Sequence, residues 1–224
     1  MTPEKAARLI DISAVRTHHT LEDIEALVEI AKDYSFINVH TLPGWTKALS
    51  LMLRDHPDIR VGAPVGFPSG GHTSRVKLLE AEQLLEDGVE EMDIVMNVGR
   101  FLNGEFGYVL DELKRIISLA GHRALTKVII ELNCLNDREM EDACKLVMDS
   151  GADFLKTGTG WVAGGANISR IARIKEMTQG RIMLKAAGGI RSYQEFEALL
   201  QLGVERFGIN ASSAVDIVSH YAAG

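Results

Sequence analysis

The chain has 224 residues, of which 46% are hydrophobic and 25% are charged, and its formal net charge is −7. This composition is typical of one globular domain with a large core, and it offers no basic surface for nucleic acid. No stretch approaches the roughly 20 continuous apolar residues of a membrane helix, and the opening MTPEKAARLIDIS lacks the apolar segment of a secretory signal. We expect a cytoplasmic protein with a single domain over residues 1–224, no nucleic-acid partner and no membrane contact.

Eight apolar, β-branched runs alternate with amphipathic, charged stretches along the chain. The runs predict strands at residues 8–15, 36–42, 59–67, 91–98, 127–135, 153–158, 182–189 and 206–210. The stretches between them predict helices that begin at cap residues or end at glycines, including 21–34 after Thr20, 73–88, 105–121 and 136–151. Strands that each precede a helix form parallel βα units.

Eight βα units in 224 residues predict an α/β fold of the (β/α)8 TIM barrel type, which typically takes ~250 residues. A doubly wound open sheet is the alternative, but no Gly-rich dinucleotide-binding turn follows the first predicted strand. The active site of such a barrel lies at the carboxyl ends of its strands. The polar residues at these ends are candidates: Asp11, His40, Asp93, Asn97, Glu131, Asn133, Lys156, Lys185 and Asn210.

The two cysteines, Cys134 and Cys144, are too few for a disulfide scaffold and follow no metal-ligand pattern. We expect both to be buried thiols. No His/Asp/Glu spacing indicates a metal site, so we expect no metal. The chemistry is therefore sought in the polar residues at the strand ends.

Two lysines leave neighbouring predicted strands at the same height. Lys156 in DFLKTGTGW and Lys185 in LKAAGGIRS each follow an apolar run and precede small residues. Two ammonium groups held close with little water disfavour each other's charge, so one pKa must fall. A neutral lysine can attack a carbonyl and form a Schiff base. Asp93 would face both lysines and transfer protons; the alternative is that the three residues form only a satisfied buried ion pair.

Gly-rich loops follow the seventh and eighth predicted strands. Backbone N–H groups of such loops commonly bind phosphate in barrels. The alternative is that the paired glycines form a tight turn and the first serine a helix cap. The candidates for an anion site are Gly160, Gly188, Gly189, Ile190, Arg191, Ser212 and Ser213.

Several segments resemble those of the deoxyribose-phosphate aldolases. DFLKTGTGW resembles the family motif K-T-S-T-G-[FY], LKAAGGIR resembles K-A-A-G-G-[IV]-R, and EEMDIVMNVG resembles E-[IV]-D-x-V-x-N-x-G. VGFPSGGHTSRVKLLEAEQLLEDG and KVIIELNCL are similar to two further family segments, so the likeness covers nearly the whole chain.

The resemblance implies a cofactor-free class I aldolase on a (β/α)8 barrel, often dimeric, so we expect a homo-oligomer. The family interconverts 2-deoxy-D-ribose 5-phosphate with acetaldehyde and D-glyceraldehyde 3-phosphate. By the same resemblance, Lys156 forms the Schiff base, Lys185 lowers the pKa of Lys156, and Asp93 transfers protons. The implied partners are small aldehydes and sugar phosphates, and the residues expected to bind them are Asp11, His40, Thr159, Gly160, Gly188, Gly189, Ile190, Arg191, Ser212 and Ser213.

The departures from the family pattern cluster where the substrate would lie. DISAV stands where the family has D-H-T-x-L, so Asp11 is kept and the His-Thr pair is lost. His40 occupies a cysteine position, and could bond a substrate hydroxyl, relay a proton, or be a core histidine bonded to a backbone carbonyl. Gly158 replaces a serine, and the FGINASS loop carries two extra residues, Ile209 and Asn210.

Four functions therefore compete. The first is the Schiff-base aldolase for deoxyribose 5-phosphate, and the second is a related Schiff-base aldolase for a different sugar, sugar phosphate or sugar acid. The third is a phosphate-binding isomerase or synthase that works without an imine. The fourth is a non-catalytic barrel that binds a sugar phosphate. We favour the first, because only an aldolase reading uses both lysines and Asp93.

Overall fold

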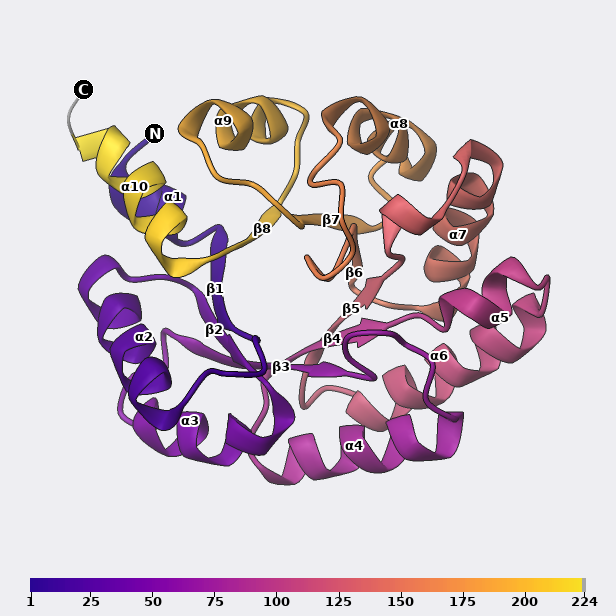
Figure 1. Ribbon diagram of the computed structural model, residues 1–224, viewed down its shortest axis with the longest axis horizontal. Coiled ribbons are helices and arrows are strands. Elements are labelled where there is room, and N and C mark those ends of the chain that lie inside the picture. Colours follow the sequence, from indigo (N-terminus) through magenta and orange to yellow (C-terminus); the bar gives the residue numbers. More distant parts are fainter. Residues whose placement is uncertain (223–224) are drawn as a thin grey trace.

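Eight parallel strands close into a barrel inside a ring of helices in the computed structural model, which describes residues 1–222 (Figure 1). The strands pair in chain order, and the last one pairs with the first. The predicted (β/α)8 TIM barrel is confirmed, and the open sheet is excluded. The strands are β1 (Ile10–Ala14), β2 (Asn38–Thr41), β3 (Arg60–Val65), β4 (Glu91–Val95), β5 (Leu125–Ile129), β6 (Phe154–Lys156), β7 (Met183–Ala187) and β8 (Arg206–Ile209).

Helices cover the outside of the barrel, and the first and last of them lie beside each other (Figure 1). Among residues 1–222, no helix has both the length and the apolar character needed to cross a membrane. Two 3-10 turns, Pro43–Trp45 and Leu132–Cys134, follow β2 and β5. The helices are α1 (Pro3–Ala7), α2 (Leu21–Tyr34), α3 (Thr46–Met52), α4 (Ser74–Glu86), α5 (Val98–Leu102), α6 (Phe106–Ala120), α7 (Asp137–Ser150), α8 (Ile168–Thr178), α9 (Tyr193–Gln201) and α10 (Ala211–Ala222).

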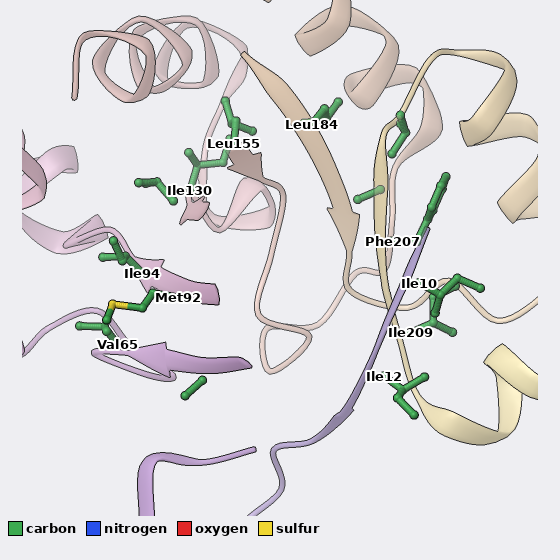
Figure 2. Close-up of a cluster of buried hydrophobic side chains, with 14 of the residues drawn as sticks. Ile10, Ile12, Val65, Met92, Ile94, Ile130, Leu155, Leu184, Phe207 and Ile209 are labelled. Carbon is green, nitrogen blue, oxygen red and sulfur yellow. The ribbon is translucent and has the colours of Figure 1, made fainter. Parts of the chain in front are cut away.

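Side chains on the strands alternate between two environments, as the geometry of a strand requires. One set is apolar and packs between the barrel and the helices; Figure 2 shows members of it, including Ile10, Ile12, Met92, Ile94, Leu155, Leu184 and Phe207. The other set is charged, is buried, and meets inside the barrel: Asp11, Glu91, Asp93, Lys127, Lys156, Lys185 and Arg206. The apolar set packs the helices onto the barrel, and the charged set forms ion pairs inside it.

The predicted helix ends are confirmed where the caps were visible in the sequence. Thr20 caps α2 in a reciprocal arrangement with Asp23, and Gly121 and Gly151 follow α6 and α7 with φ of 54° and 82°. These glycines end the helices because L side chains rarely adopt positive φ.

The predicted strand over residues 127–135 is wrong at its carboxyl end. β5 stops at Ile129, and Glu131 adopts a left-handed φ of 50°, which turns the chain out of the barrel. The apolar residues that follow form a 3-10 turn in which Leu132 is buried but Cys134 is exposed. The expectation of two buried thiols is therefore correct only for Cys144, which lies on α7.

Replacing Asn136 with alanine is expected to lower the melting temperature by roughly 2–4 °C. Asn136 Oδ1 accepts from the Glu139 N–H at 3.0 Å, and Glu139 Oε2 accepts from the Asn136 N–H at 2.6 Å. Loss of such an N-cap typically costs about 1 kcal/mol. Thermal unfolding followed by circular dichroism measures the change. The exposed Lys145, on the same helix, provides the control: Lys145→Ala should leave the melting temperature nearly unchanged.

Candidate active site

A cavity of about 1000 Å³ opens at the carboxyl ends of the strands. Its walls come from the strand ends, from the loops after β1, β6, β7 and β8, and from one side of α2. Nearly all the residues predicted to act on or bind the substrate line this cavity: Asp11, His40, Asp93, Lys156, Thr159, Gly160, Lys185, Gly188, Gly189, Ile190, Arg191 and Ser212.

Several candidates lie elsewhere. Asn97 accepts from the Arg100 N–H at 3.3 Å and so caps α5. Ser213 is not among the residues that line the cavity, because its N–H donates to Asn210 Oδ1 at 3.0 Å and its Oγ accepts from Asn210 Nδ2 at 3.1 Å. Asn210 itself lines the cavity and caps α10. Of these two candidates in the loop after β8, Asn210 lines the cavity and Ser213 does not.

Of the two residues expected to lengthen the loop after β8, Ile209 lies in the strand and Asn210 in the loop. Ile209 is buried and pairs with Ile12 in the register of β8 and β1, so it completes the strand. In β1, Ile12 packs in the apolar core, whereas Ser13 lines the cavity with a hydroxyl. The substitution of the family's His-Thr pair therefore changes the cavity wall at one position only.

Glu131 and Asn133 hold the loop that follows β6. Glu131 accepts from the N–H of Thr159 at 3.3 Å and also from the Thr159 hydroxyl. A Cβ on Gly158 would lie 2.9 Å from Glu131 Oε1, so the absence of a side chain at this position lets the carboxylate approach the loop. Asn133 Nδ2 donates to Gly165 O at 3.3 Å. Glu131 and Asn133 therefore hold the loop after β6, which follows Lys156, from outside the cavity.

Lys156 and Lys185 meet at one carboxylate oxygen. The two residues stand opposite each other in the register of β6 and β7. Each Nζ lies 2.7 Å from Asp93 Oδ2. The Lys156 side chain is 11% exposed and that of Lys185 only 2%, so Lys156 is the more accessible amine. The predicted juxtaposition of two lysines and one acid is present.

An ion network continues from Asp93 toward the amino ends of the strands. Lys127 Nζ lies 3.2 Å from Asp93 Oδ1 and 2.5 Å from Glu91 Oε2. Glu91 precedes Asp93 by two positions on β4, so both carboxylates point to the same side of the strand. This spacing was the available signal for Glu91, which the sequence analysis overlooked together with Lys127.

The second branch of the network passes through Asp11. Lys185 Nζ lies 2.6 Å from Asp11 Oδ2, and an Arg206 nitrogen lies 2.7 Å from Asp11 Oδ1. Arg206 also lies 3.3 Å from Glu91 Oε2, which closes a loop of charges inside the barrel. Asp11 is only 1% exposed, so its carboxylate mainly contacts the charged residues of the network and presents little surface to the cavity. Arg206 was likewise overlooked, because an arginine at the start of a strand resembles an ordinary surface residue.

Burial and charge set the protonation of this group. Burial lowers the pKa of Lys185 to about 8, although the nearby Asp11 and Asp93 carboxylates act to raise it. Burial acts to raise the pKa of Asp93, but the positive groups around it outweigh that effect and hold this pKa well below its usual value. The predicted fall of one lysine pKa thus occurs at Lys185, and its largest cause is burial and not the neighbouring ammonium group.

The loop after β7 presents a row of backbone donors to the cavity. In the part of the chain that the structure describes, the N–H groups of Gly188, Gly189 and Ile190 donate to no protein acceptor. Gly188 and Gly189 have φ of 98° and 96°, and a Cβ on Gly189 would come within 2.8 Å of Gly165 Cα. Conformation therefore favours glycine at both positions, and space requires it at Gly189 as well. The cradle fits an oxyanion such as phosphate.

Aromatic and basic residues close the rim of the cavity. Arg16 Nη2 donates to Gly160 O at 3.1 Å, and the Arg16 guanidinium lies 5.4 Å from the ring centre of Trp161. Phe67 packs edge-on against Trp161 with ring centres 5.8 Å apart. Arg16 and Phe67 could not be predicted from the sequence, since both lie in loops whose course the strand pattern does not reveal.

This arrangement is suited to Schiff-base chemistry. It has an accessible amine, a second amine whose pKa is lowered to about 8, and a carboxylate that contacts both. Such a group can form an imine with a carbonyl and carry protons to and from it. The anion cradle lines the same cavity.

The chain matches the family model described as DeoC/LacD family aldolase over residues 5–211. It is 44% identical to a deoxyribose-phosphate aldolase of Sinorhizobium medicae, with 100% of this chain and 90% of the relative covered. It is 39% identical to the corresponding protein of Klebsiella pneumoniae, with 97% and 88% covered. Among solved structures, deoxyribose phosphate aldolase from Aeropyrum pernix, described as having a unique tetrameric structure, has a TM-score of 0.89 and 30% identity, with 99% of this chain and 92% of that chain covered.

Proposed function

The chain belongs to the DeoC/LacD family of aldolases, and we propose that it cleaves 2-deoxy-D-ribose 5-phosphate reversibly into acetaldehyde and D-glyceraldehyde 3-phosphate through a Schiff base on Lys156. It is an aldolase, a carbon–carbon lyase. The observation that carries the mechanism is the shared contact of Lys156 and Lys185 with Asp93 Oδ2, both at 2.7 Å.

In the proposed cleavage, the neutral amine of Lys156 attacks the C1 aldehyde of the open-chain sugar. The carbinolamine loses water and becomes a protonated imine. The imine then accepts the electron pair of the C2–C3 bond, while the C3 hydroxyl loses its proton and leaves as the aldehyde of glyceraldehyde 3-phosphate. Protonation of the enamine at C2 and hydrolysis release acetaldehyde and restore the amine.

Asp93 and Lys185 carry the protons of these steps. Asp93 Oδ2 contacts both amines, so a proton on Lys156 can pass through the carboxylate to Lys185. With a pKa of about 8, Lys185 is neutral in roughly a tenth of the molecules at pH 7. An ordinary lysine would be neutral in fewer than about one molecule in a thousand at that pH. Lys185 is therefore the better acceptor for the proton that Lys156 must lose.

The substrate phosphate is assigned to the cradle of Gly188, Gly189 and Ile190. Arg191 and Ser212 line the cavity beside it and supply a positive charge and a hydroxyl. Ser212 stands in the first turn of α10, where free N–H groups and the helix dipole favour an anion.

The rate of imine formation is expected to rise with pH and to level off above about pH 8. The sign follows from Lys185: its pKa is lowered to about 8, so its neutral, proton-accepting form increases as the pH rises to that value. Stopped-flow measurement of kcat/KM from pH 6 to 9.5 records the profile. Lys185→Arg keeps the positive charge at every pH, so its kcat/KM should not show the rise toward pH 8. A flat wild-type profile would contradict the role given to Lys185.

Reductive trapping tests the proposed function directly. The protein is incubated with acetaldehyde or with 2-deoxy-D-ribose 5-phosphate, reduced with borohydride, and mapped by mass spectrometry. We expect an adduct on Lys156 with both compounds. Absence of any adduct would contradict the imine mechanism.

A related Schiff-base aldolase for a different sugar is the second candidate, and the altered rim favours it. Asn210, Arg16 and Trp161 stand at the cavity mouth where the acceptor aldehyde would lie. A panel of aldehydes with and without phosphate, each supplied with acetaldehyde, separates the two candidates by kcat/KM. A higher value for an unphosphorylated or acidic acceptor would favour the second.

We also propose a homo-oligomer and a cytoplasmic location. The tetrameric description of the Aeropyrum pernix relative supports the first proposal. Exposed apolar side chains on α4, Val76 and Leu79, give a surface suited to a second subunit. Light scattering coupled to size-exclusion chromatography measures the mass in solution.

A further inference from the structure

His40 lies in a buried side-chain cluster that the proposed mechanism does not use. It is 4% exposed, and its Nε2 lies 3.2 Å from Asp93 Oδ1. Its Nδ1 contacts the side-chain amide of Asn38, which stands two positions earlier on β2 and is fully buried. Neither ring nitrogen contacts a backbone carbonyl, so His40 is not the ordinary core histidine that the sequence left open.

Three buried polar atoms in this cluster lack a hydrogen-bond partner: Asn38 Nδ2, His40 Nε2 and Asp93 Oδ1. Turning the Asn38 amide over moves no heavy-atom position and gives Asn38 Nδ2 an acceptor, while His40 Nε2 and Asp93 Oδ1 face each other across 3.2 Å. Asn38 Nδ2 then donates to His40 Nδ1, and the proton of the neutral ring must lie on Nε2. That nitrogen lies 3.2 Å from Asp93 Oδ1.

The charges around the ring favour its neutral form. Asp93 faces it from β4, Lys127 from β5 and Lys185 from β7, while Asp11 lies nearby on β1. β3 contributes Gly62 and Pro64, which carry no charge. The network already holds four cations, Lys127, Lys156, Lys185 and Arg206, against three carboxylates, Asp11, Glu91 and Asp93. A protonated ring would add a fifth positive charge, and burial lowers the pKa of His40.

The neighbouring strand leaves room for this cluster. Gly62 stands opposite His40 in the register of β2 and β3. A Cβ at Gly62 would overlap the imidazole of His40 and lie 2.6 Å from the Asn38 amide oxygen. The absence of a side chain at Gly62 therefore leaves space for the imidazole between Asn38 and Asp93.

We propose that His40 is a positioning residue for the aldolase reaction, donating Nε2–H to Asp93 Oδ1 so that Asp93 Oδ2 stays directed at Lys156 and Lys185. Asn38 fixes the tautomer, and Gly62 provides the space. The carboxylate then cannot rotate without losing the His40 bond. This inference rests on the proposed function, and the experiment below has an arm that does not depend on activity.

Kinetics of two variants test the positioning role. His40→Leu removes the donor and is expected to lower kcat about 10- to 100-fold with KM changed less than about threefold, as for loss of a hydrogen bond to a charged group. His40→Gln keeps an N–H donor of similar reach and should retain kcat within about fivefold. His122→Leu, at an exposed histidine between α6 and β5, is the control. An unchanged kcat in His40→Leu, or an equal loss in both variants, would overturn the proposal.

Nuclear magnetic resonance of protein labelled with ¹⁵N-histidine reads the tautomer itself. The His40 signals, assigned by their absence in His40→Gln, are expected to show a neutral ring with the proton on Nε2, unchanged from pH 6 to 8. In Asn38→Asp, the carboxylate has no proton to donate, so the ring should carry a proton on Nδ1. An Nδ1–H tautomer or an imidazolium in the wild type would overturn the proposal. Failure of acetaldehyde trapping would refute the proposed function and leave this reading of His40 intact.

Discussion

Replacing Lys156 with alanine is expected to lower kcat for cleavage of 2-deoxy-D-ribose 5-phosphate by at least about 10⁴-fold, as for removal of an enzymic nucleophile. Every covalent step of the proposed mechanism passes through Lys156 Nζ. Lys185 cannot replace it, because its side chain is only 2% exposed and contacts both Asp11 and Asp93. An assay that couples glyceraldehyde 3-phosphate release to NADH oxidation measures kcat.

The same variant should keep its fold. Alanine removes one cation from a network in which cations outnumber carboxylates, so the remaining charges are better balanced. Circular dichroism and the melting temperature check this point. Lys145→Ala changes an exposed lysine that is 67% accessible and should leave kcat within about twofold. A Lys156→Ala protein that still forms a borohydride-trapped adduct would place the Schiff base on another lysine.

The fold could be predicted because its signal is periodic. Eight apolar runs separated by helix-length polar stretches fix the number and order of the strands, and caps such as Thr20 and Gly151 mark helix ends. The error after β5 has a local cause: Glu131 adopts a left-handed conformation that the apolar run around it does not indicate. A conformation held by contacts with a distant loop, here that of Thr159, leaves no trace in the local pattern.

The lysine pair could be predicted because equal positions on adjacent parallel strands become neighbours, and Lys156 and Lys185 are paired in register. Lys127 was open to the same reasoning, because it stands opposite Asp93 in the register of β4 and β5. Arg206 was not, because it lies on β8 and reaches Asp11 only when β8 closes on β1. The position of rim residues such as Arg16 depends on the course of the loops, which the strand pattern does not predict. The local sequence pattern thus indicates the order of the strands, but not the contacts that form when the barrel closes.

Replacing Asp93 with asparagine is expected to cost about 3–5 kcal/mol of unfolding free energy at pH 7, the usual loss when one partner of a buried ion pair is removed. Asp93 is 1% exposed and contacts Lys127, Lys156 and Lys185. Without it, the four cations of the network face only Asp11 and Glu91. Urea unfolding at several pH values measures the change, and kcat should fall by about 10³-fold, since proton transfer depends on this carboxylate.

The pH dependence of the Asp93→Asn deficit separates this explanation from a simple packing defect. Loss of a carboxylate lowers the folded-state pKa of the neighbouring lysines further, and that of Lys185 is already about 8 in the wild type. Between the lower folded-state pKa of such a lysine in Asp93→Asn and its higher folded-state pKa in the wild type, only the variant has lost the proton in its folded state, so only the variant gains stability as the pH rises. The deficit should therefore shrink from pH 7 to pH 10. Asp111→Asn, at an exposed carboxylate paired with Arg115, should show no deficit at any pH. A deficit that stays constant across this range would mean that Asp93 supports the barrel by packing, and that the charge balance argued for the lysines is wrong.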